Sequence, residues 1–542
     1  MSKKKSKAIP THFKIATFDS IGSASAEADT DFLADCFVDH GYLERIRDCR
    51  NPARIVVGNT GAGKSALMSR LGQTCERVID VAPETLAINH ISNSDILQFL
   101  AGLGVRMDTF YKLLWRHVLL IEVIQRRFDI TPGSPKPSVI ERVKNLFRVH
   151  HRRLLNYFEN HASDFFVERE VRVTTVTETL EKKIDAELKG TIPGSDVGGR
   201  LAAARSLSVE KQSELRERVQ HVVNASQIKE LGGLIVALDE ALSDTQKPYY
   251  LTIDGLDEDW VDDAIRFRLI RALIETARDF RKVKNAKIVV AMRRDLLDRV
   301  LLETRDIGLQ AEKIREMYLP LSWTRAQLVE VMDTRIAHLV KKRFAKSQTV
   351  YHSDLFPTAI DRVAFKDAVF KQLVHRPRDV LEFVNICLRR SDGKKGITSK
   401  VVKESLGDYS RYRLGATLDE WRGIYPNLEH YVQLLKKRPH SYKLHEITDE
   451  QLNELPIMEP LANLDAVAAA YLNSDARNLR IQLAVAYYRS GIAGLKIDSQ
   501  NSAEFSEAGR TISTAEITDE ASIVIHGAYW RVLGTQVRSS IA

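Results

Sequence analysis

A glycine-rich loop between an apolar strand and a helix is the feature that most constrains this chain. Residues 54–57, Arg-Ile-Val-Val, read as a short buried strand and run directly into Gly58-Asn-Thr-Gly-Ala-Gly-Lys-Ser65. Residues 66–71 continue with helical periodicity, with Leu67 and Leu71 on the inner side. The order strand, GxxxxGKS loop, helix is that of a phosphate-binding loop. We therefore expect an α/β fold in which a parallel sheet carries this loop at one edge.

The residue types in this loop suit the phosphates of a nucleotide. Glycines let consecutive backbone N–H groups turn inward around phosphate oxygens, and the helix N-terminus adds a partial positive charge. Lys64 would bridge the β- and γ-phosphates, and the Ser65 hydroxyl would complete the coordination of Mg²⁺. We expect the nucleotide-binding residues to be Gly58, Asn59, Thr60, Gly61, Ala62, Gly63, Lys64, Ser65 and Ala66.

An acidic strand end supplies the carboxylates that hydrolysis requires. Tyr249-Tyr-Leu-Thr-Ile253 is apolar and β-prone, and Asp254 follows it, where its carboxylate would contact Mg²⁺ through water. Asp257 and Glu258 lie just beyond, where a carboxylate could polarise the attacking water. Acidic clusters are common on protein surfaces, but the glycine loop upstream favours a catalytic role. The residues alone do not decide which of the two orients water.

A third strand would bring positive charge to the same edge of the sheet. Ala286-Lys-Ile-Val-Val-Ala-Met292 ends in Arg293, which could sense the γ-phosphate and which we count among the catalytic candidates with Lys64. The competing interpretation is that Arg293 pairs with nearby carboxylates. Two further strands are expected, at Thr85–His90, between the loop and the acidic strand in sequence, and at Met317–Leu321.

Most of the remaining chain has a helical pattern. Residues 94–244 are far too many for a loop and carry apolar side chains near a 3.6-residue period, which predicts a helical insertion. Ser138-Val-Ile-Glu141 is a capping box that would open one of its helices. Residues 322–424 predict a helical lid, in which Arg378 is a candidate to reach the phosphates or, alternatively, to form an ion pair at a helix start.

The last part of the chain mixes helices with a late strand. Helical patterns at Leu428–Leu435 and Leu479–Tyr488 precede the strand Ser522–His526, which favours a winged-helix-like domain. The expected fold is thus an α/β P-loop core of the additional-strand class, in which the strand at Thr85–His90 is placed between the glycine loop and the acidic strand in the sequence. We place the core at 1–93 and 245–321, the insertion at 94–244, the lid at 322–424 and the winged-helix-like domain at 425–542.

Composition limits the possible function classes. At roughly 150 residues per domain, the 542 residues hold more than one folding unit, and 44% hydrophobic residues are typical of globular proteins. The net charge of +8 permits an anionic partner without demanding one. The sequence has neither a membrane-length apolar run nor an export signal, and its cysteines lack metal spacing. We expect a cytoplasmic protein with free thiols and no membrane partner.

Several separated motifs resemble one family, the bacterial STAND-type and origin-recognition-like AAA+ ATPases. The acidic strand end is similar to the DxLDxxW pattern of that family, here Asp254-Gly-Leu-Asp-Glu-Asp-Trp260. The resemblance spans most of the chain and also rests on Asp35–Val38, Tyr111–Trp115, Leu321–Trp323 and Arg376–Asp379. It implies ATP with Mg²⁺ as ligands, an effector protein as partner, homo-oligomerisation, and membership of antiviral defence gene clusters.

The chain departs from that family in two respects. Arg293 stands where AAA+ proteins usually have Asn or Thr at the end of the corresponding strand. An arginine-finger motif does not stand out, and Arg305 and Arg315 are the candidates for that role.

Four functions remain open at this stage. The favoured one is a slow or trigger-dependent ATPase switch that, as the resemblance implies, controls an effector in bacterial antiphage defence. The alternative is a DNA-binding AAA+-type loader or motor, whose nucleic-acid binding would depend on salt. A small-molecule kinase would have to exclude water, whereas Asp257 and Glu258 favour activating it. A nucleotide-stabilised scaffold would bind without turnover.

Overall fold

The computed structural model consists of two compact units. The first, here the sheet unit, comprises Asp39–Thr60 and Lys64–Leu321; the second, the helical unit, comprises Met1–Val38, Gly61–Gly63 and Ser322–Ala542. The structure describes residues 13–26, 28–86, 95–130, 133, 140–141, 144–145, 155–156, 159, 167–189, 192, 201–204, 206–243, 246–258, 260–261, 263–304, 314–344, 350–455, 465–498, 500–506 and 512–537.

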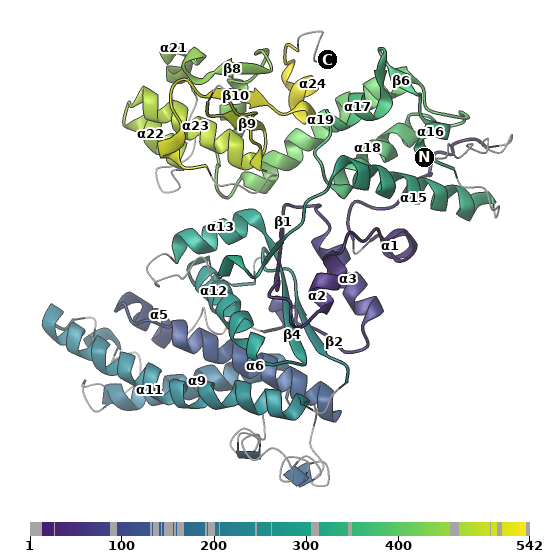
Figure 1. Ribbon diagram of the computed structural model, residues 1–542. Coiled ribbons are helices and arrows are strands. Elements are labelled where there is room, and N and C mark those ends of the chain that lie inside the picture. The colour runs from purple at the N-terminus through teal and green to yellow at the C-terminus, as the bar shows by residue number, and fades with distance from the viewer. Residues whose placement is uncertain are drawn as a thin grey trace. The chain divides into compact units, whose positions relative to one another are not determined.

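The sheet unit is built on a five-stranded parallel sheet. Its strands are β1 (Ile55–Gly58), β2 (Val78–Asp80), β3 (Tyr249–Ile253), β4 (Ala286–Arg293) and β5 (Tyr318–Pro320). They lie in the order β2-β3-β4-β1-β5, and every neighbouring pair is parallel (Figure 1). β1 and β3 are buried along their whole length, as expected for continuous apolar runs in a sheet covered on both faces. The expected α/β class is therefore confirmed.

The expected strand Thr85–His90 is wrong at the two residues that the structure describes. Within Thr85–His90, Thr85 and Leu86 belong to the 3-10 helix η1 (Pro83–Leu86), and residues 87–90 lie outside the described part of the chain. The strand that pairs with β3 is instead β2, a few residues earlier. Pro83 opens η1, because its fixed φ suits the first position of a helical turn.

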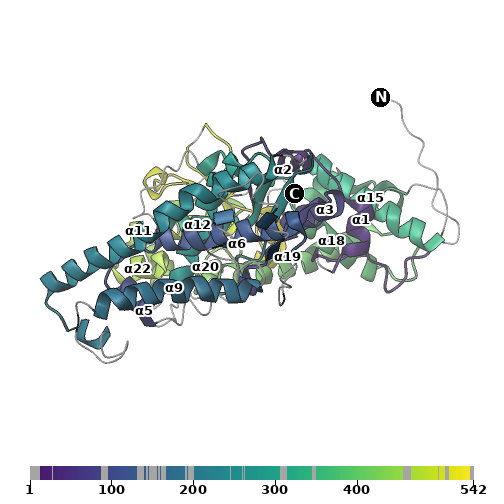
Figure 2. The same cartoon turned by 90° about the horizontal axis from the view of Figure 1, so that it is seen from below.

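Helices surround this sheet and fill the interval between β2 and β3, as expected for the described residues of 94–244. The helices are α2 (Tyr42–Arg47), α3 (Lys64–Thr74), α5 (Asp95–Gly102), α6 (Asp108–Phe128), α9 (Arg169–Lys189), α11 (Val209–Leu242), α12 (Asp263–Asp279), η3 (Phe280–Lys282) and α13 (Arg294–Glu303). The almost wholly buried α6 packs against α12 and α11, and α6, α9 and α11 lie side by side (Figure 2). Ser138 of the expected capping box lies outside the described residues.

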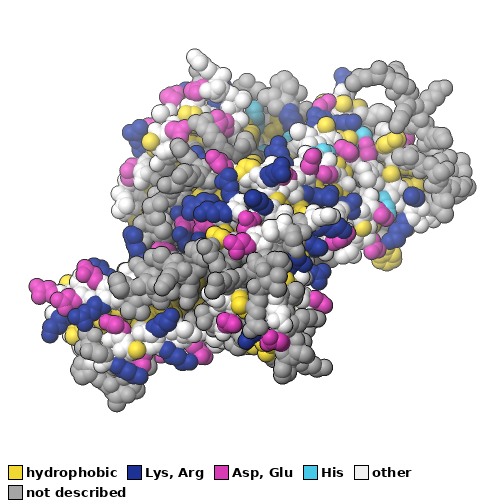
Figure 3. Space-filling model, turned by 60° about the horizontal axis from the view of Figure 1, so that its bottom comes forward, with side chains coloured by type: hydrophobic (Ala, Val, Ile, Leu, Met, Phe, Trp, Pro, Cys, Tyr) yellow, Lys and Arg dark blue, Asp and Glu magenta, His cyan; other side chains and the backbone are white. Residues whose placement is uncertain are grey.

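Charged side chains of both signs lie on the face of the molecule in Figure 3. On the face in Figure 3, Lys and Arg side chains lie interspersed with Asp and Glu. On α9 this takes the form of ion pairs one helical turn apart, Lys182 with Glu178 and Lys189 with Asp185. These exposed pairs are typical of a solvated helix face.

A buried cation anchors the turn that leads into β1. Lys287 of β4 is fully buried, and its Nζ donates to the carbonyl oxygens of Arg45 (2.9 Å), Asp48 (2.8 Å) and Asn51 (3.3 Å). Burial, reinforced by the positive charge of Arg54, lowers the pKa of Lys287 to about 7. One ammonium therefore holds the α2–β1 connection against the sheet.

The first part of the helical unit is mainly helical, as expected. It contains α1 (Thr30–Cys36), α15 (Arg325–Phe344), α16 (His352–Leu355), α17 (Phe365–Phe370), α18 (Pro377–Arg389) and α19 (Ser399–Trp421), with an unforeseen hairpin of β6 (Ala359–Ile360) and β7 (Val363–Ala364). A buried ion pair between Arg335 of α15 and Asp29 (Nη2–Oδ2, 2.5 Å) ties the segment before α1 to this unit.

The last part of the helical unit adds a three-stranded antiparallel sheet. Its elements are α20 (Leu428–Gln433), β8 (Ser441–Lys443), η5 (Leu444–Glu446), α21 (Asp449–Asn453), α22 (Ala466–Leu472), α23 (Ala476–Ser490), β9 (Ala493–Lys496), η8 (Thr514–Glu516), β10 (Ser522–Ile525), η9 (Gly527–Tyr529) and α24 (Trp530–Leu533). The strand order is β8-β10-β9. The expected late strand corresponds to β10, and the two expected helices correspond to α20 and α23.

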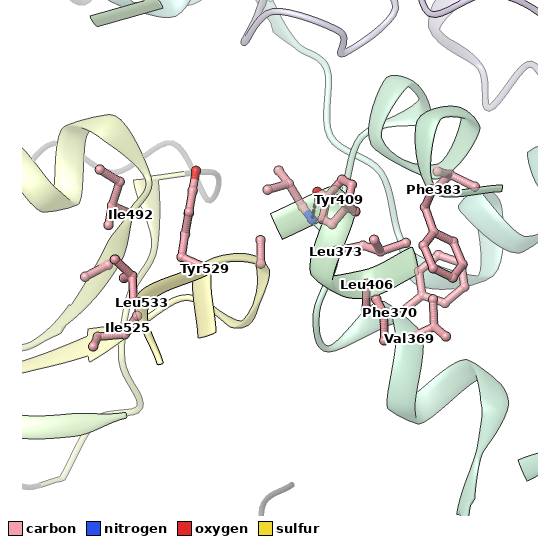
Figure 4. Packing of buried hydrophobic residues seen from close by; sticks show 14 of the residues in the cluster. Val369, Phe370, Leu373, Phe383, Leu406, Tyr409, Ile492, Ile525, Tyr529 and Leu533 are labelled. Carbon is pink, nitrogen blue, oxygen red and sulfur yellow. Dashed lines mark hydrogen bonds between the residues drawn. The ribbon is translucent and has the colours of Figure 1, made fainter. Parts of the chain in front are cut away.

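One hydrophobic core extends through the helical unit. Figure 4 shows part of it, from Phe370 and Phe383 past Tyr409 of α19 to Ile525 and Leu533. The contact is closest at η9, where a Cβ on Gly527 would lie 1.9 Å from the carbonyl oxygen of Lys371. The 3-10 helix η9 therefore packs against α19 and against the turn after α17.

Candidate functional site

The glycine loop, residues 58–65, connects β1 to α3. Gly61 (φ +79°) and Gly63 (φ +98°) adopt left-handed backbone conformations that favour glycine. Lys64 opens α3, and its Nζ donates to the carbonyl oxygens of Gly58 (3.1 Å) and Asn59 (3.2 Å). The ammonium therefore lies over the start of the loop, while Ser65 and Ala66 occupy the first turn of the helix.

The expected acidic residues follow β3 at the same edge of the sheet. Gly58 is in register with Arg293 of β4, and Ile253 is in register with Val290. Asp254 therefore leaves the sheet beside the end of β4, with β4 alone between it and the glycine loop. The N–H of Gly255 (φ +78°) donates to Asp254 Oδ1 at 2.9 Å and fixes the carboxylate at the strand end.

Glu258 lies in the turn after Asp254 and faces a second glutamate. Its backbone N–H donates to the Gly255 carbonyl (3.1 Å), and its carbonyl accepts from Arg266 Nη1 (3.2 Å). A Cβ on Gly255 would lie 3.6 Å from Glu258 Oε1 and 3.8 Å from Glu84 Oε1, so both carboxyl groups meet over this glycine. A hydrogen bond that protonated Glu258 donates to Glu84, partial burial and the surrounding negative charges of Glu84, Asp257 and Asp254 raise the pKa of Glu258 to about 7.

Glu84 was not foreseen from the sequence. It belongs to η1, just after β2, and no motif surrounds it. Its position beyond a strand that neighbours β3 is the one signal that points to it. That signal depends on finding β2 and the sheet order.

Arg293 ends β4 in a network of carboxylates. Its Nε and Nη2 donate to Asp295 Oδ1 (3.0 Å) and Oδ2 (2.8 Å), and Nη1 lies 3.4 Å from Asp257 Oδ2. Arg293 thus forms the carboxylate pairs that one interpretation of the sequence predicted, and these pairs bring it beside the expected catalytic residue Asp257. Of the arginine-finger candidates, Arg305 lies outside the described residues and Arg315 is exposed before β5.

The tip of the glycine loop packs within the helical unit. Trp323 Nε1 donates to the Ala62 carbonyl at 2.8 Å, and the Arg378 N–H donates to the Gly61 carbonyl at 3.4 Å. A Cβ on Gly61 would lie 2.6 Å from Arg378 Cβ, so the close approach requires glycine. Arg378 Nε donates to the Ala24 carbonyl at 3.0 Å. The sequence-predicted Arg378 is therefore a direct neighbour of the loop.

Residues 326–418 match the family model of the FunZ-associated C-terminal helical domain. The match begins in α15 and ends within α19, so the matched segment contains Arg378 but not the glycine loop. The match covers most of the helical residues between 322 and 424, and the three-stranded sheet lies outside it. The chain has no match among curated proteins.

The described residues contain no group of three or more His, Cys, Asp or Glu side chains that could hold a metal ion. Ser65 and Asp254 offer hard oxygen donors, which suit Mg²⁺ when phosphates provide further ligands. All four cysteines carry free thiols. No helix among the described residues is long and apolar enough to cross a membrane.

Proposed function

We propose that this protein binds ATP with Mg²⁺ and hydrolyses it as a trigger-dependent switch that controls a partner protein. The observation that carries the proposal is the order of three strand ends. The glycine loop follows β1, Arg293 ends the neighbouring β4, and Asp254 follows the next strand, β3. A strand between the loop strand and the acidic strand is typical of the additional-strand class of P-loop ATPases.

Each residue has a distinct role in this proposal. Backbone N–H groups of the glycine loop and the ammonium of Lys64 would bind the phosphates. Ser65 and Asp254 would hold Mg²⁺, which neutralises phosphate charge when bound. Glu258 or Asp257 would orient and deprotonate the attacking water, and Arg293 would sense the γ-phosphate.

The carboxylate pairs favour a switch over a constitutive ATPase. Glu258 shares a hydrogen bond with Glu84, and Arg293 is held in two contacts by Asp295. A general base that is bonded to a second acid cannot at the same time accept a proton from water at that oxygen. Turnover therefore requires these contacts to rearrange. A trigger could start hydrolysis by breaking them.

The three-stranded sheet supports a winged-helix interpretation of this region, but the contacts of α23 do not favour DNA reading by that helix. Arg477 and Arg480 of α23 form ion pairs with Asp519 (3.3 Å) and Asp449, respectively, and residues 483–488 are buried. These arginines are already neutralised. We therefore retain the switch as the proposal, together with the effector partner, the homo-oligomer and the antiphage role that the family resemblance implies.

The test is phosphate release from ATP by wild type, Lys64→Ala and Glu258→Gln, each with and without duplex DNA. Glu429→Gln, an exposed change on α20, is the matched control for loss of one carboxylate. We expect release by wild type and the control only. Binding of ATP without any release would mean that turnover needs a trigger absent from the assay or that the protein is a scaffold, and stimulation by DNA would favour the loader.

A further inference from the structure

Asp379, next to Arg378 in sequence, is a fully buried carboxylate in the first turn of α18. Tyr409 of α19 donates its hydroxyl to Asp379 Oδ1 at 2.7 Å. The same hydroxyl oxygen accepts the backbone N–H of Val374 at 3.1 Å. A single side chain thus binds the chain on both sides of Arg376–Arg378.

The start of α18 lacks a side-chain cap. Its N-cap residue, Arg376, makes no side-chain capping hydrogen bond, and Pro377 at the first helical position has no N–H to donate. The Tyr409 hydroxyl accepts from Val374, two residues before the N-cap, and donates to Asp379 in the first turn, so it bridges the chain across the helix start. The orientation of this turn therefore depends on α19.

Two buried arginines, Arg376 and Arg413, pair with Asp379. Arg376 Nε lies 3.3 Å from its Oδ2, and Arg413 Nη1 lies 3.8 Å from its Oδ1. Burial lowers the pKa of Arg413, but Asp379, Tyr529 and Glu420 outweigh burial, so the net pKa is raised and the guanidinium stays charged. Arg413 Nε donates to the Thr417 hydroxyl at 3.1 Å.

The network continues from Thr417 into η9. The Thr417 Oγ1 and the Tyr529 hydroxyl are 2.8 Å apart, and Ser410 donates to the Ala528 carbonyl at 2.7 Å. Figure 4 shows Tyr409 on the side of the hydrophobic core that faces Tyr529. Polar contacts therefore connect the turn before Arg378 with the last elements of the chain.

We propose that Tyr409 is a positioning residue for Arg378, holding the start of α18 so that Arg378 stays against Gly61 of the glycine loop. The inference rests on the proposed function, because it assigns to the Tyr409 hydroxyl an effect on nucleotide affinity. Tyr409 would affect nucleotide affinity through its hydrogen bonds to Asp379 and Val374, without contact with the nucleotide.

Tyr487 provides a matched control. It is also fully buried and donates its hydroxyl, to the Tyr431 carbonyl at 2.6 Å, but it lies in α23, outside the FunZ-associated domain. Tyr409→Phe and Tyr487→Phe therefore remove the same atom from equally buried sites. Thermal unfolding of both variants establishes that their stabilities are comparable.

The experiment measures the affinity of the full chain for a fluorescent ATP analogue with Mg²⁺. We expect Tyr409→Phe to weaken binding about fivefold or more and Tyr487→Phe to change it less than about twofold. In an Arg378→Ala background, Tyr409→Phe should have no further effect, because its action passes through Arg378. Wild-type affinity in Tyr409→Phe, or equal weakening with and without Arg378, overturns the inference.

A second readout separates this inference from the proposed function. Hydrogen exchange of the nucleotide-free protein should become faster at residues 61–63 and 374–379 in Tyr409→Phe, and not in Tyr487→Phe. If wild type does not bind the analogue, the proposed function is wrong, and the exchange result alone judges the positioning role. Unchanged exchange in Tyr409→Phe overturns that role.

Discussion

The carboxyl groups of Glu84 and Glu258 are joined by a hydrogen bond over Gly255. Two acids can share such a bond only when one of them carries a proton. The pKa of Glu258 rises accordingly from 4.5 to about 7. Glu84 therefore controls the charge of the residue that we propose as the general base.

Replacing Glu84 by Gln should lower the pKa of Glu258, because the amide donates to the charged carboxylate and removes a neighbouring negative charge. In wild type the folded protein binds the proton more tightly than the unfolded chain. The contribution of Glu258 to the free energy of unfolding is thus complete below pH 4.5 and is lost as the pH rises through about 7. Glu84→Gln should make the free energy of unfolding, measured by urea denaturation, depend less on pH across that window. Glu429→Gln is the control, and an unchanged pH dependence in Glu84→Gln would contradict the pairing.

Substitution of Arg293 should separate nucleotide binding from hydrolysis. Arg293→Met removes the group proposed to sense the γ-phosphate, so phosphate release should fall about tenfold or more, while ADP affinity stays near that of wild type. Arg293→Lys should not restore release, because an ammonium cannot reproduce the paired contacts of Nε and Nη2 with Asp295. Parallel loss of ADP binding would show that Arg293 merely supports the fold.

Gly61→Ala should destabilise the protein more than Gly41→Ala. Both glycines have positive φ, and alanine in that conformation costs about 1 kcal/mol at either site. A Cβ meets nothing within 4 Å at Gly41 but lies 2.6 Å from Arg378 Cβ at Gly61, which adds a clash. We expect the total for Gly61→Ala to reach about 2 kcal/mol in urea unfolding. An equal cost at both glycines would refute the close approach of Arg378.

Gly527→Ala and Gly415→Ala should have opposite effects. A Cβ at Gly527 would lie 1.9 Å from a backbone carbonyl oxygen, so the end of the chain has to shift, at a cost of about 2 kcal/mol or more. Gly415 is exposed within α19 with nothing within 4 Å, and alanine there should stabilise the helix by about 1 kcal/mol. Thermal unfolding of the two variants compares them directly. Equal stability would show that η9 does not pack tightly.

Prediction from sequence worked where a local pattern was sufficient. The residues of β3 form one apolar run between turn residues, and the strand was found with the expected bounds. β2 was missed because three residues are too few for a periodic signal, and its pairing with β3 is a tertiary contact. Because β2 was not predicted, the position of Glu84 just after it was not recognised either. The contacts of Tyr409 with Val374 and Asp379 bridge residues more than a helix apart in sequence, so no spacing indicated them.

The buried Lys287 can report on local opening of the sheet unit. An amine-reactive reagent in water cannot reach its Nζ while the three carbonyl oxygens of the α2–β1 connection enclose it. Opening of this connection would expose the amine and return it to the reactivity of an ordinary lysine. The rate at which Lys287 becomes labelled, followed by mass spectrometry, therefore measures how often the base of the sheet opens, without any added probe.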